Sequence, residues 1–186
     1  MTDKRDAILQ AAVELFSERG FHGTPVPMIV EKANVSTGTM YRYFRDKEEL
    51  VNVLYRHWKL EMVKATIEGL SENLPLRQLF HEIWCRWVNF ALEHQAAYSF
   101  LEAHHHAPYL DAESCALTNG LHKRYIEFFE RGRREQIVKD MAPEVLMAVV
   151  TGIMIEMMKE HWAGWFELTP ETVDQAEEIC WEAIRR

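Results

Sequence analysis

The apolar residues of this chain recur at the spacing of an α-helix from its first residues onward. Ile8, Ala12 and Leu15 mark one face of a first helix, which Gly20 is expected to end. No run alternates apolar and polar residues as a half-buried strand does. The sequence therefore predicts an all-α fold, and 186 residues are enough to bury a substantial core.

Capping signals set the expected boundaries of the next helices. Thr24 followed by Pro25 predicts the start of a second helix, because these residue types favour the N-cap and the first helical position. Ser36 is expected to cap a third helix, and Asp46 with Glu49 resembles a capping box that opens a fourth. These helices are expected near residues 26–33, 37–43 and 47–70. The second and third have the size of a helix-turn-helix.

Prolines divide the rest of the chain. Pro75, Pro108, Pro143 and Pro170 each interrupt the helical pattern. Further helices are therefore expected near residues 76–94, 96–105, 110–134, 143–165 and 170–185. The prediction is a protein of about nine helices, with a compact three-helix head in residues 1–46 and a larger helical body in residues 47–186.

Charge is distributed unevenly between these two parts. The formal net charge of −8 by itself argues against a nucleic-acid partner. Residues 1–60, however, contain nine lysine and arginine residues against eight acidic ones, a balance of +1. Residues 61–186 contain twelve against twenty-one, a balance of −9. Any contact with phosphate is therefore expected in the first third of the chain.

Membrane, secreted and enzymatic classes find no support in the sequence. The longest nearly apolar run, residues 145–158, has 14 residues and is too short to span a bilayer, and the N-terminus lacks the pattern of a signal peptide. The three cysteines are far apart and form no CxxC pair, which fits a reducing cytoplasm. No nucleophile elbow, P-loop, HExxH or dinucleotide fingerprint is present. We therefore expect a cytoplasmic protein that is no enzyme and holds no cofactor.

Residues 35–50, VSTGTMYRYFRDKEEL, are too short, polar and aromatic for a core helix. Thr37, Gly38 and Thr39 fill the first turn of the third helix, where free backbone N–H groups attract phosphate and glycine permits a close approach. Thr37, Thr39 and Arg42 are of a size to reach base edges in a major groove, and arginine suits guanine O6 and N7. This combination predicts a DNA-reading helix.

Aromatic and basic residues around this helix complete the predicted contact. Tyr41 and Tyr43 can give their hydroxyls to phosphates, and Lys47 adds a charge at the start of the next helix. Phe44 and Leu50 are expected in the core. The alternative is an amphipathic hairpin whose aromatic side chains only pack.

Residues 8–55 resemble the DNA-binding head of the TetR family of bacterial transcriptional regulators. The motifs that carry the resemblance are AAVELFSERGFHGT at residues 11–24, VSTGTMYRYF at 35–44 and DKEEL at 46–50. The resemblance implies that the 37–43 helix is the recognition helix. It also implies that phosphates are contacted by Thr24, Tyr41, Tyr43 and Lys47, and that the groove is faced by Thr37, Gly38, Thr39 and Arg42. Ser36, the expected cap of this helix, completes the predicted DNA-binding residues.

Two positions depart from the family pattern. The turn between the second and third helices usually carries glycine where this chain has Asn34, but asparagine tolerates the left-handed conformation. Early in the second helix, Pro25 and Pro27 stand where the family often has serine and a basic residue. Both prolines are therefore left out of the predicted contacts.

The helix at 143–165 is apolar on nearly all sides and must be covered on both sides. One side would pack on the protomer, and a second chain would cover the other, with the last helix as companion. The alternative is a central buried helix in a monomer. The residues predicted at a homodimer interface are Leu146, Val149, Val150, Ile153, Met157, Val173, Ala176 and Cys180.

Most of the six tryptophans and many of the nine methionines lie in the body. Aromatic and methionine side chains suit cavities for flat, hydrophobic and often cationic ligands, although plain core packing is the alternative for each residue. The predicted ligand-binding residues are Trp84, Trp87, Phe90, Tyr98, Phe128 and Met154.

The run His104, His105 and His106 resembles a metal site only superficially. Consecutive helical residues point about 100° apart, so three in a row do not readily share one ion. A solvated helix C-terminus before Pro108 is the favoured interpretation, and no metal site is predicted.

The sequence thus predicts a DNA-binding transcriptional regulator, most simply a homodimeric repressor that a small hydrophobic or aromatic effector releases from a pseudo-palindromic operator on double-stranded DNA. The alternative is a small helical protein that binds a ligand or a metal without affinity for DNA.

Overall fold

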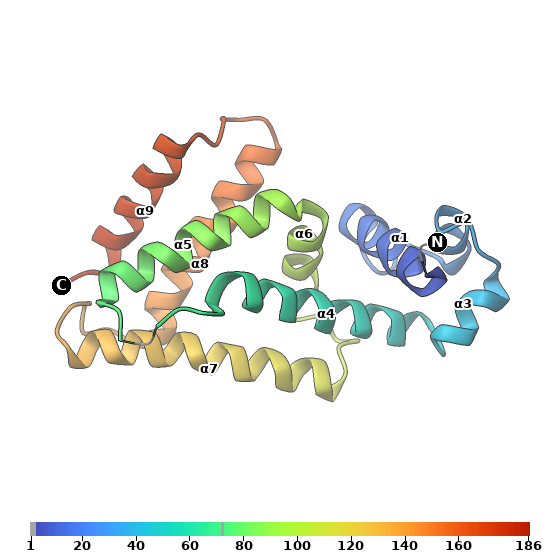
Figure 1. The fold of residues 1–186 in the computed structure, drawn as a ribbon, viewed down its shortest axis with the longest axis horizontal. Coiled ribbons are helices and arrows are strands. Elements are labelled where there is room, and N and C mark those ends of the chain that lie inside the picture. The colour runs from blue at the N-terminus through green and yellow to red at the C-terminus, as the bar shows by residue number, and fades with distance from the viewer. Residues whose placement is uncertain (1–2, 72) are drawn as a thin grey trace. The chain divides into compact units, whose positions relative to one another are not determined.

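The computed structural model of the protein describes residues 3–71 and 73–186. Within these residues it contains nine α-helices and no β-strand, which confirms the all-α prediction (Figure 1). The predicted boundaries agree with the observed ones to within about one helical turn. The helices are α1 (Lys4–Arg19), α2 (Val26–Lys32), α3 (Thr37–Tyr43), α4 (Lys47–Ile67), α5 (Leu76–Glu93), α6 (Gln95–His104), α7 (Ala112–Arg134), α8 (Pro143–Trp162) and α9 (Pro170–Ile184).

Local signals account for the helix ends in the N-terminal region. Gly20 ends α1 with a φ of 66°, a left-handed conformation that glycine adopts without strain. Asp46 precedes α4, and its carboxylate accepts a hydrogen bond from the backbone N–H of Glu49 over 2.7 Å. Glu49 accepts in return from the N–H of Arg45 rather than from that of Asp46, so the predicted capping box is shifted by one residue.

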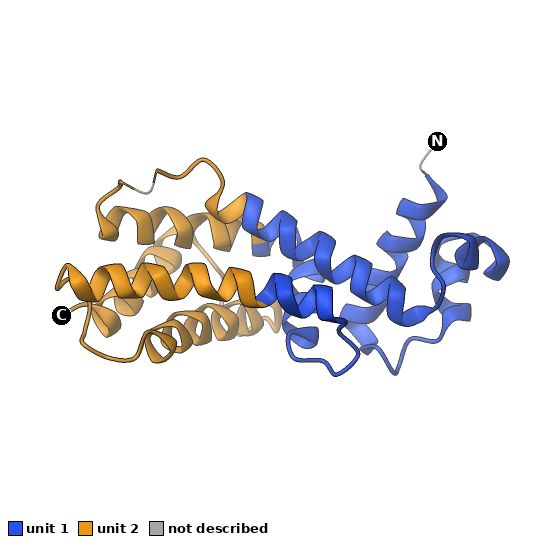
Figure 2. Cartoon of the chain, turned by 90° about the horizontal axis from the view of Figure 1, so that it is seen from below, with its two compact units in different colours: residues 1–64, 91–118 blue, residues 65–90, 119–186 orange. Residues whose placement is uncertain are grey.

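The chain divides into two compact units that do not follow sequence order (Figure 2). The first contains residues 1–64 and 91–118, and the second contains residues 65–90 and 119–186. The first unit joins segments distant in sequence because α1 packs against α6, where the Phe16 and Phe100 rings stack with their centroids 6.1 Å apart. The division into a head of residues 1–46 and a body of residues 47–186 stays a prediction.

His104 lies in this aromatic core and not at a solvated helix end, so that interpretation was wrong for this residue. Its side chain is buried, and its Nδ1 is 2.7 Å from the carbonyl oxygen of Phe100. The imidazole also packs against the rings of Phe100 and Tyr109, with centroids 4.4 and 5.8 Å away. Burial lowers the pKa of His104, although the bond to the Phe100 carbonyl acts in the opposite direction.

The free energy of unfolding is expected to fall as the pH drops below about 6.5, the ordinary pKa of histidine. The folded pKa of His104 lies below that value, so the unfolded chain binds the proton more readily. The stability is therefore fully present above the unfolded pKa and is lost as the pH falls. One such proton contributes a slope of at most about 1.4 kcal/mol per pH unit. Chemical denaturation at a series of pH values measures it.

A matched pair of variants isolates this contribution. His104→Phe should flatten the dependence of stability on pH, whereas His106→Phe, at an exposed position two residues further on, should leave it unchanged. An unaltered slope in His104→Phe would show that His104 does not titrate in this range.

Candidate nucleic-acid interface

Helices α2 and α3 form the predicted helix-turn-helix within the first unit. The turn passes through Asn34, whose φ of 51° lies in the left-handed region that asparagine tolerates. Ser36 then caps α3, because its side chain accepts a hydrogen bond from the backbone N–H of Thr39 over 3.1 Å. Both features confirm the predictions made for this turn.

Helix α3 is anchored by one side chain and presents the others. Met40 is fully buried, and Phe44, which follows the helix, is buried as expected. Thr39 is half-buried, with its hydroxyl 2.9 Å from that of Ser36. Tyr41 and Tyr43 expose 51% and 42% of their surface, so neither ring belongs to the core. The exposed residues are Ser36, Thr37, Gly38, Tyr41, Arg42 and Tyr43.

Gly38 occupies a helical position where no contact among the described residues requires glycine. A Cβ added there would lie 3.9 Å from the hydroxyl of Ser36, which is an ordinary contact, and the backbone is not left-handed. Glycine within a helix destabilises it by about 0.5–1 kcal/mol relative to alanine. Packing within the described part of the chain therefore does not account for the missing side chain.

Thr24 does not belong to this surface. Its side chain is fully buried, and its hydroxyl lies 2.8 Å from the Gly20 carbonyl oxygen and 3.1 Å from that of Leu15. Pro25, and not Thr24, is the N-cap of α2, so the predicted capping role was also wrong. Because the hydroxyl is used to fix the end of α1, we remove the Thr24 side chain from the candidate contacts.

Lys47 has an internal role that the sequence did not reveal. Its ammonium group donates to the carbonyl oxygens of Phe21 and Thr24 over 2.8 and 3.2 Å, and lies 4.0 Å from the centre of the Phe21 ring. Burial lowers the pKa of this lysine. The side chain thus ties the start of α4 to the loop before α2. A phosphate contact would use the third N–H of the ammonium group.

The residues predicted at a dimer interface divide into two groups. Four of them are buried in the second unit, because they face the core of the protomer. These residues, which we remove from the candidate dimer surface, are Leu146, Val150, Met157 and Cys180. The others remain exposed or half-buried, namely Val149, Ile153, Val173 and Ala176.

Helices α8 and α9 pack together, and each leaves an apolar stripe uncovered. On α8 the stripe follows helical spacing through Val145 and Val149, which expose 45% and 36% of their surface, to the exposed Gly152. On α9 it contains Ala176 and Ile179, and Ile179 is 66% exposed. Val145 was not among the predicted interface residues, because α8 is apolar nearly all round and its sequence shows no preferred face.

The predicted ligand-binding residues belong to different units. Tyr98 lies in the first unit, and the other five lie in the second. Trp84 is buried and stacks on Phe80, with ring centroids 6.0 Å apart. The indole nitrogens of Trp84 and Trp87, one helical turn apart on α5, are both buried and have no hydrogen-bond partner among the described residues. The remaining predicted residues are Phe90 and Met154, which are buried, and Phe128, which is half-buried.

Among the described residues, every helix is too short or too polar to cross a membrane.

Family models match almost the whole chain in two adjoining parts. The model described as bacterial regulatory proteins, tetR family, matches residues 8–54. The model described as tetracyclin repressor-like, C-terminal domain, matches residues 58–186.

Relatives that match the whole chain or half of it are described as transcriptional regulators. The chain is 24% identical over 186 residues to a helix-turn-helix transcriptional regulator of Haemophilus influenzae, covering 100% of this chain and 97% of that protein. It is 30% identical over 93 residues to the regulator YhgD of Bacillus subtilis, covering 50% and 49% of the two chains. A TetR family structure from Marinobacter aquaeolei VT8 superimposes with a TM-score of 0.87 at 23% identity, covering 98% of this chain and 95% of that one.

Proposed function

Because the chain belongs to the TetR family of bacterial transcriptional regulators, we propose that it represses transcription as a homodimer bound to a pseudo-palindromic operator. Helix α3 of each protomer would enter the major groove, with the two half-sites about one helical turn of DNA apart or somewhat more. Gly38 and Arg42 would face the bases, while Tyr41 and Tyr43 would give their hydroxyls to phosphates.

Gly38 is the observation that carries this proposal. An exposed glycine in a short capped helix lowers the stability of the helix and is required by no contact within the chain. It supports a function in which the backbone of α3 comes close to a large partner. The neighbouring exposed Arg42 and tyrosines have the chemistry that double-stranded DNA requires of such a partner.

The uncovered stripes of α8 and α9 support the homodimer. Large contiguous apolar patches on a soluble protein mark interaction sites, and the exposed Val145, Val149 and Ile179 of these two packed helices would contribute to one. A second copy of the chain would cover the same stripes on both protomers, as a two-fold axis requires. Such a dimer would present two copies of α3 to one operator.

The unpartnered indole N–H groups of Trp84 and Trp87 support an effector that carries a hydrogen-bond acceptor next to a flat apolar body. A buried donor without a partner destabilises the protein by about 1–3 kcal/mol, and a bound ligand could accept from it. Trp84→Phe and Trp87→Phe remove the N–H groups and leave a smaller aromatic ring at each position. They should weaken effector binding and leave operator binding unchanged.

Helix α4 would transmit the state of the body to the head, since it is continuous from Lys47 to Ile67. Within the first unit, the amide of the buried Asn52 fixes this helix. It donates to the carbonyl oxygen of Tyr109 and accepts from the N–H of Asp111, both over 2.8 Å. Arg56 adds an ion pair with Asp111 over 2.8 Å. A shift of residues 109–111 would therefore move α4.

A band-shift titration with the DNA upstream of the protein's own gene tests the proposal. A repressor should bind this DNA specifically, and its affinity should fall steeply as salt is added. The alternative, a ligand- or metal-binding protein without DNA affinity, predicts no shifted band at any salt concentration.

Replacing Arg42 by alanine is expected to weaken operator binding by about 1–3 kcal/mol and to relax the base preference at one position of each half-site. The reason is that a bidentate arginine contact distinguishes guanine from the other bases. Binding to operators varied at single positions measures both effects. Arg134→Ala removes the same charge from an exposed position at the end of α7 and should change neither. An equal loss for all sequences would make Arg42 a phosphate contact.

A further inference from the structure

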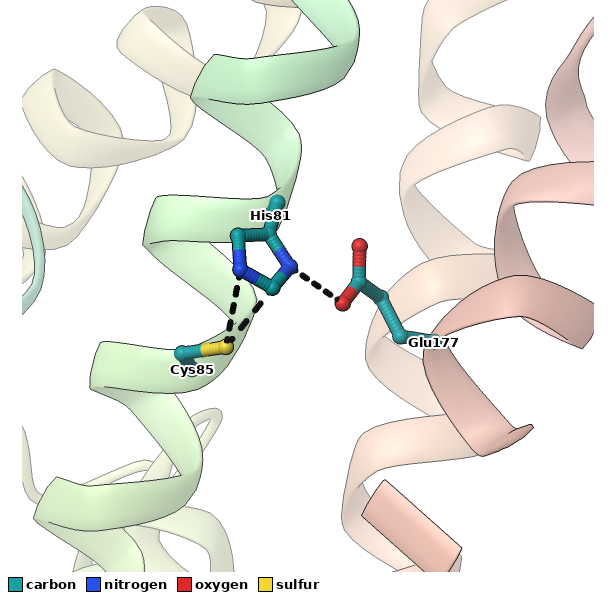
Figure 3. Close-up of side chains that lie close together, drawn as sticks. All are labelled: His81, Cys85 and Glu177. Atoms are coloured by element: carbon teal, nitrogen blue, oxygen red, sulfur yellow. Dashed lines mark hydrogen bonds and ion pairs between the residues drawn. The ribbon is translucent and has the colours of Figure 1, made fainter. Parts of the chain in front are cut away.

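Three potential metal ligands meet where α9 packs on α5 in the second unit (Figure 3). His81 and Cys85 lie one helical turn apart on α5, and Glu177 reaches them from α9. The Nδ1 of His81 is 2.6 Å from a carboxylate oxygen of Glu177, and the sulfur of Cys85 is 3.8 Å from both ring nitrogens. One ligand atom from each residue falls within 4.8 Å of the others.

These separations are close to those of a tetrahedral zinc site. Zinc binds sulfur at about 2.3 Å and nitrogen or oxygen at about 2.0–2.2 Å, so its ligand atoms lie about 3.3–3.6 Å apart. The distance from sulfur to imidazole nitrogen, 3.8 Å, is slightly longer than this range. The distance from imidazole to carboxylate, 2.6 Å, is that of a hydrogen bond, which would lengthen when a metal ion replaces the shared proton.

Glu177 is already held in the orientation of a ligand. Its side chain is 3% exposed, and the guanidinium of Arg77 donates to the carboxylate oxygen that does not face His81. A hydrogen bond of this kind fixes a metal-ligating carboxylate from behind. The second oxygen is left for His81 or for an ion at the same place.

The surroundings of the thiol favour a cation. Burial raises the pKa of Cys85, and so do the nearby carboxylates of Glu177, Asp174 and Glu82, while Arg77 acts in the opposite direction. The same negative charges that disfavour a thiolate alone would stabilise a thiolate bound to a divalent ion. His81, with 48% of its side chain exposed, leaves a path from solvent.

We propose that His81, Cys85 and Glu177 bind a zinc-class divalent transition-metal ion, which ties α9 to α5. A thiolate and an imidazole select such an ion over magnesium or calcium, which prefer oxygen ligands. Three protein ligands leave the fourth position of a tetrahedral ion for water or a small anion. The site lies outside the helix-turn-helix and does not depend on the proposed repression. In the sequence, only the spacing of four residues between His81 and Cys85 points to this site, because Glu177 lies 96 residues after His81.

Cobalt titration of the reduced, full-length, metal-free protein tests this site. Wild-type protein should bind one Co²⁺ per protomer and develop sulfur-to-cobalt charge-transfer absorption in the near ultraviolet, which added Zn²⁺ should abolish by displacement. Cys85→Ser should lose this absorption and bind Co²⁺ more than about 100-fold less tightly, since even indirect support of a metal ligand is worth about 10–100-fold. Cys115→Ser, which alters an exposed thiol in the first unit, is the matched control and should behave as wild type.

Thermal unfolding gives an independent readout. At a free Zn²⁺ concentration of about 100 times Kd, the Tm of the wild type should rise by about 5–10 °C, and that of Cys85→Ser and His81→Asn should not. Both substitutions are at partly exposed positions and leave the ion pair of Glu177 with Arg77 in place. A wild type without charge-transfer absorption, or absorption that persists in Cys85→Ser, overturns the proposal. Glu177 would then serve only as an ion-pair link between α5 and α9.

Discussion

A Val149→Glu, Ile179→Glu double variant should lose tight operator binding although α3 is untouched. Both side chains are exposed in the protomer, with 36% and 66% of their surface accessible, so the substitutions should leave its fold intact. In the proposed dimer the same positions face a second chain. A glutamate there would be buried without a partner, which costs several kcal/mol and separates the protomers.

The loss of affinity follows from the loss of the second α3. One head can contact only one half-site, and the high effective concentration of the other head is forfeited. Operator affinity should therefore fall about 10²- to 10⁴-fold at protomer concentrations where the wild type is a dimer. Sedimentation equilibrium measures the mass, and a band-shift titration measures the affinity.

The control places the same chemistry elsewhere. Leu60→Glu and Leu92→Glu alter side chains that are 52% and 42% exposed and belong to the first unit, whereas α8 and α9 belong to the second. The Leu60→Glu, Leu92→Glu double variant should remain dimeric and bind the operator as the wild type does. A dimeric Val149→Glu, Ile179→Glu protein with normal operator affinity would mean that the two stripes are not the interface.

Gly38→Leu is expected to change stability and DNA binding in opposite directions. A Cβ added at Gly38 lies 3.9 Å from the Ser36 hydroxyl, an ordinary contact, and replacing a glycine in a helix removes its entropic cost. The free energy of unfolding should therefore stay the same or rise by up to about 1 kcal/mol. The same side chain would hold the backbone of α3 away from the DNA. Operator binding should weaken by at least the value of one base contact, about 1–3 kcal/mol or 5- to 150-fold.

The contrast between these two measurements excludes misfolding as the cause. Gly120→Leu is the matched control, because Gly120 is an exposed glycine within α7 and an added Cβ there meets nothing. It should stabilise the protein similarly and leave operator affinity unchanged. Unaltered operator binding by Gly38→Leu would show that α3 does not approach DNA through this residue.

The sequence by itself determined the helices and the helix-turn-helix. Prolines, Gly20 and Ser36 act through the backbone of their own neighbourhood, so their effects can be read locally. Asn34 adopts the left-handed conformation for the same local reason. The exposed surface of α3 was equally readable, because a short helix with one apolar anchor, Met40, has little choice of which side to bury.

Only the tertiary structure decided which groups are left free after packing. The hydroxyl of Thr24 donates to the carbonyl oxygen of Gly20, and the ammonium of Lys47 donates to that of Phe21. Both groups therefore bind the backbone of the chain itself, which their residue types do not reveal. On α8, Leu146 is buried while Val149 is exposed, although both are aliphatic. His81 meets Glu177 only because α9 packs on α5. Residue type fixes what a side chain can bind, but the packing of distant segments fixes what it meets, and that pairing is absent from any local pattern.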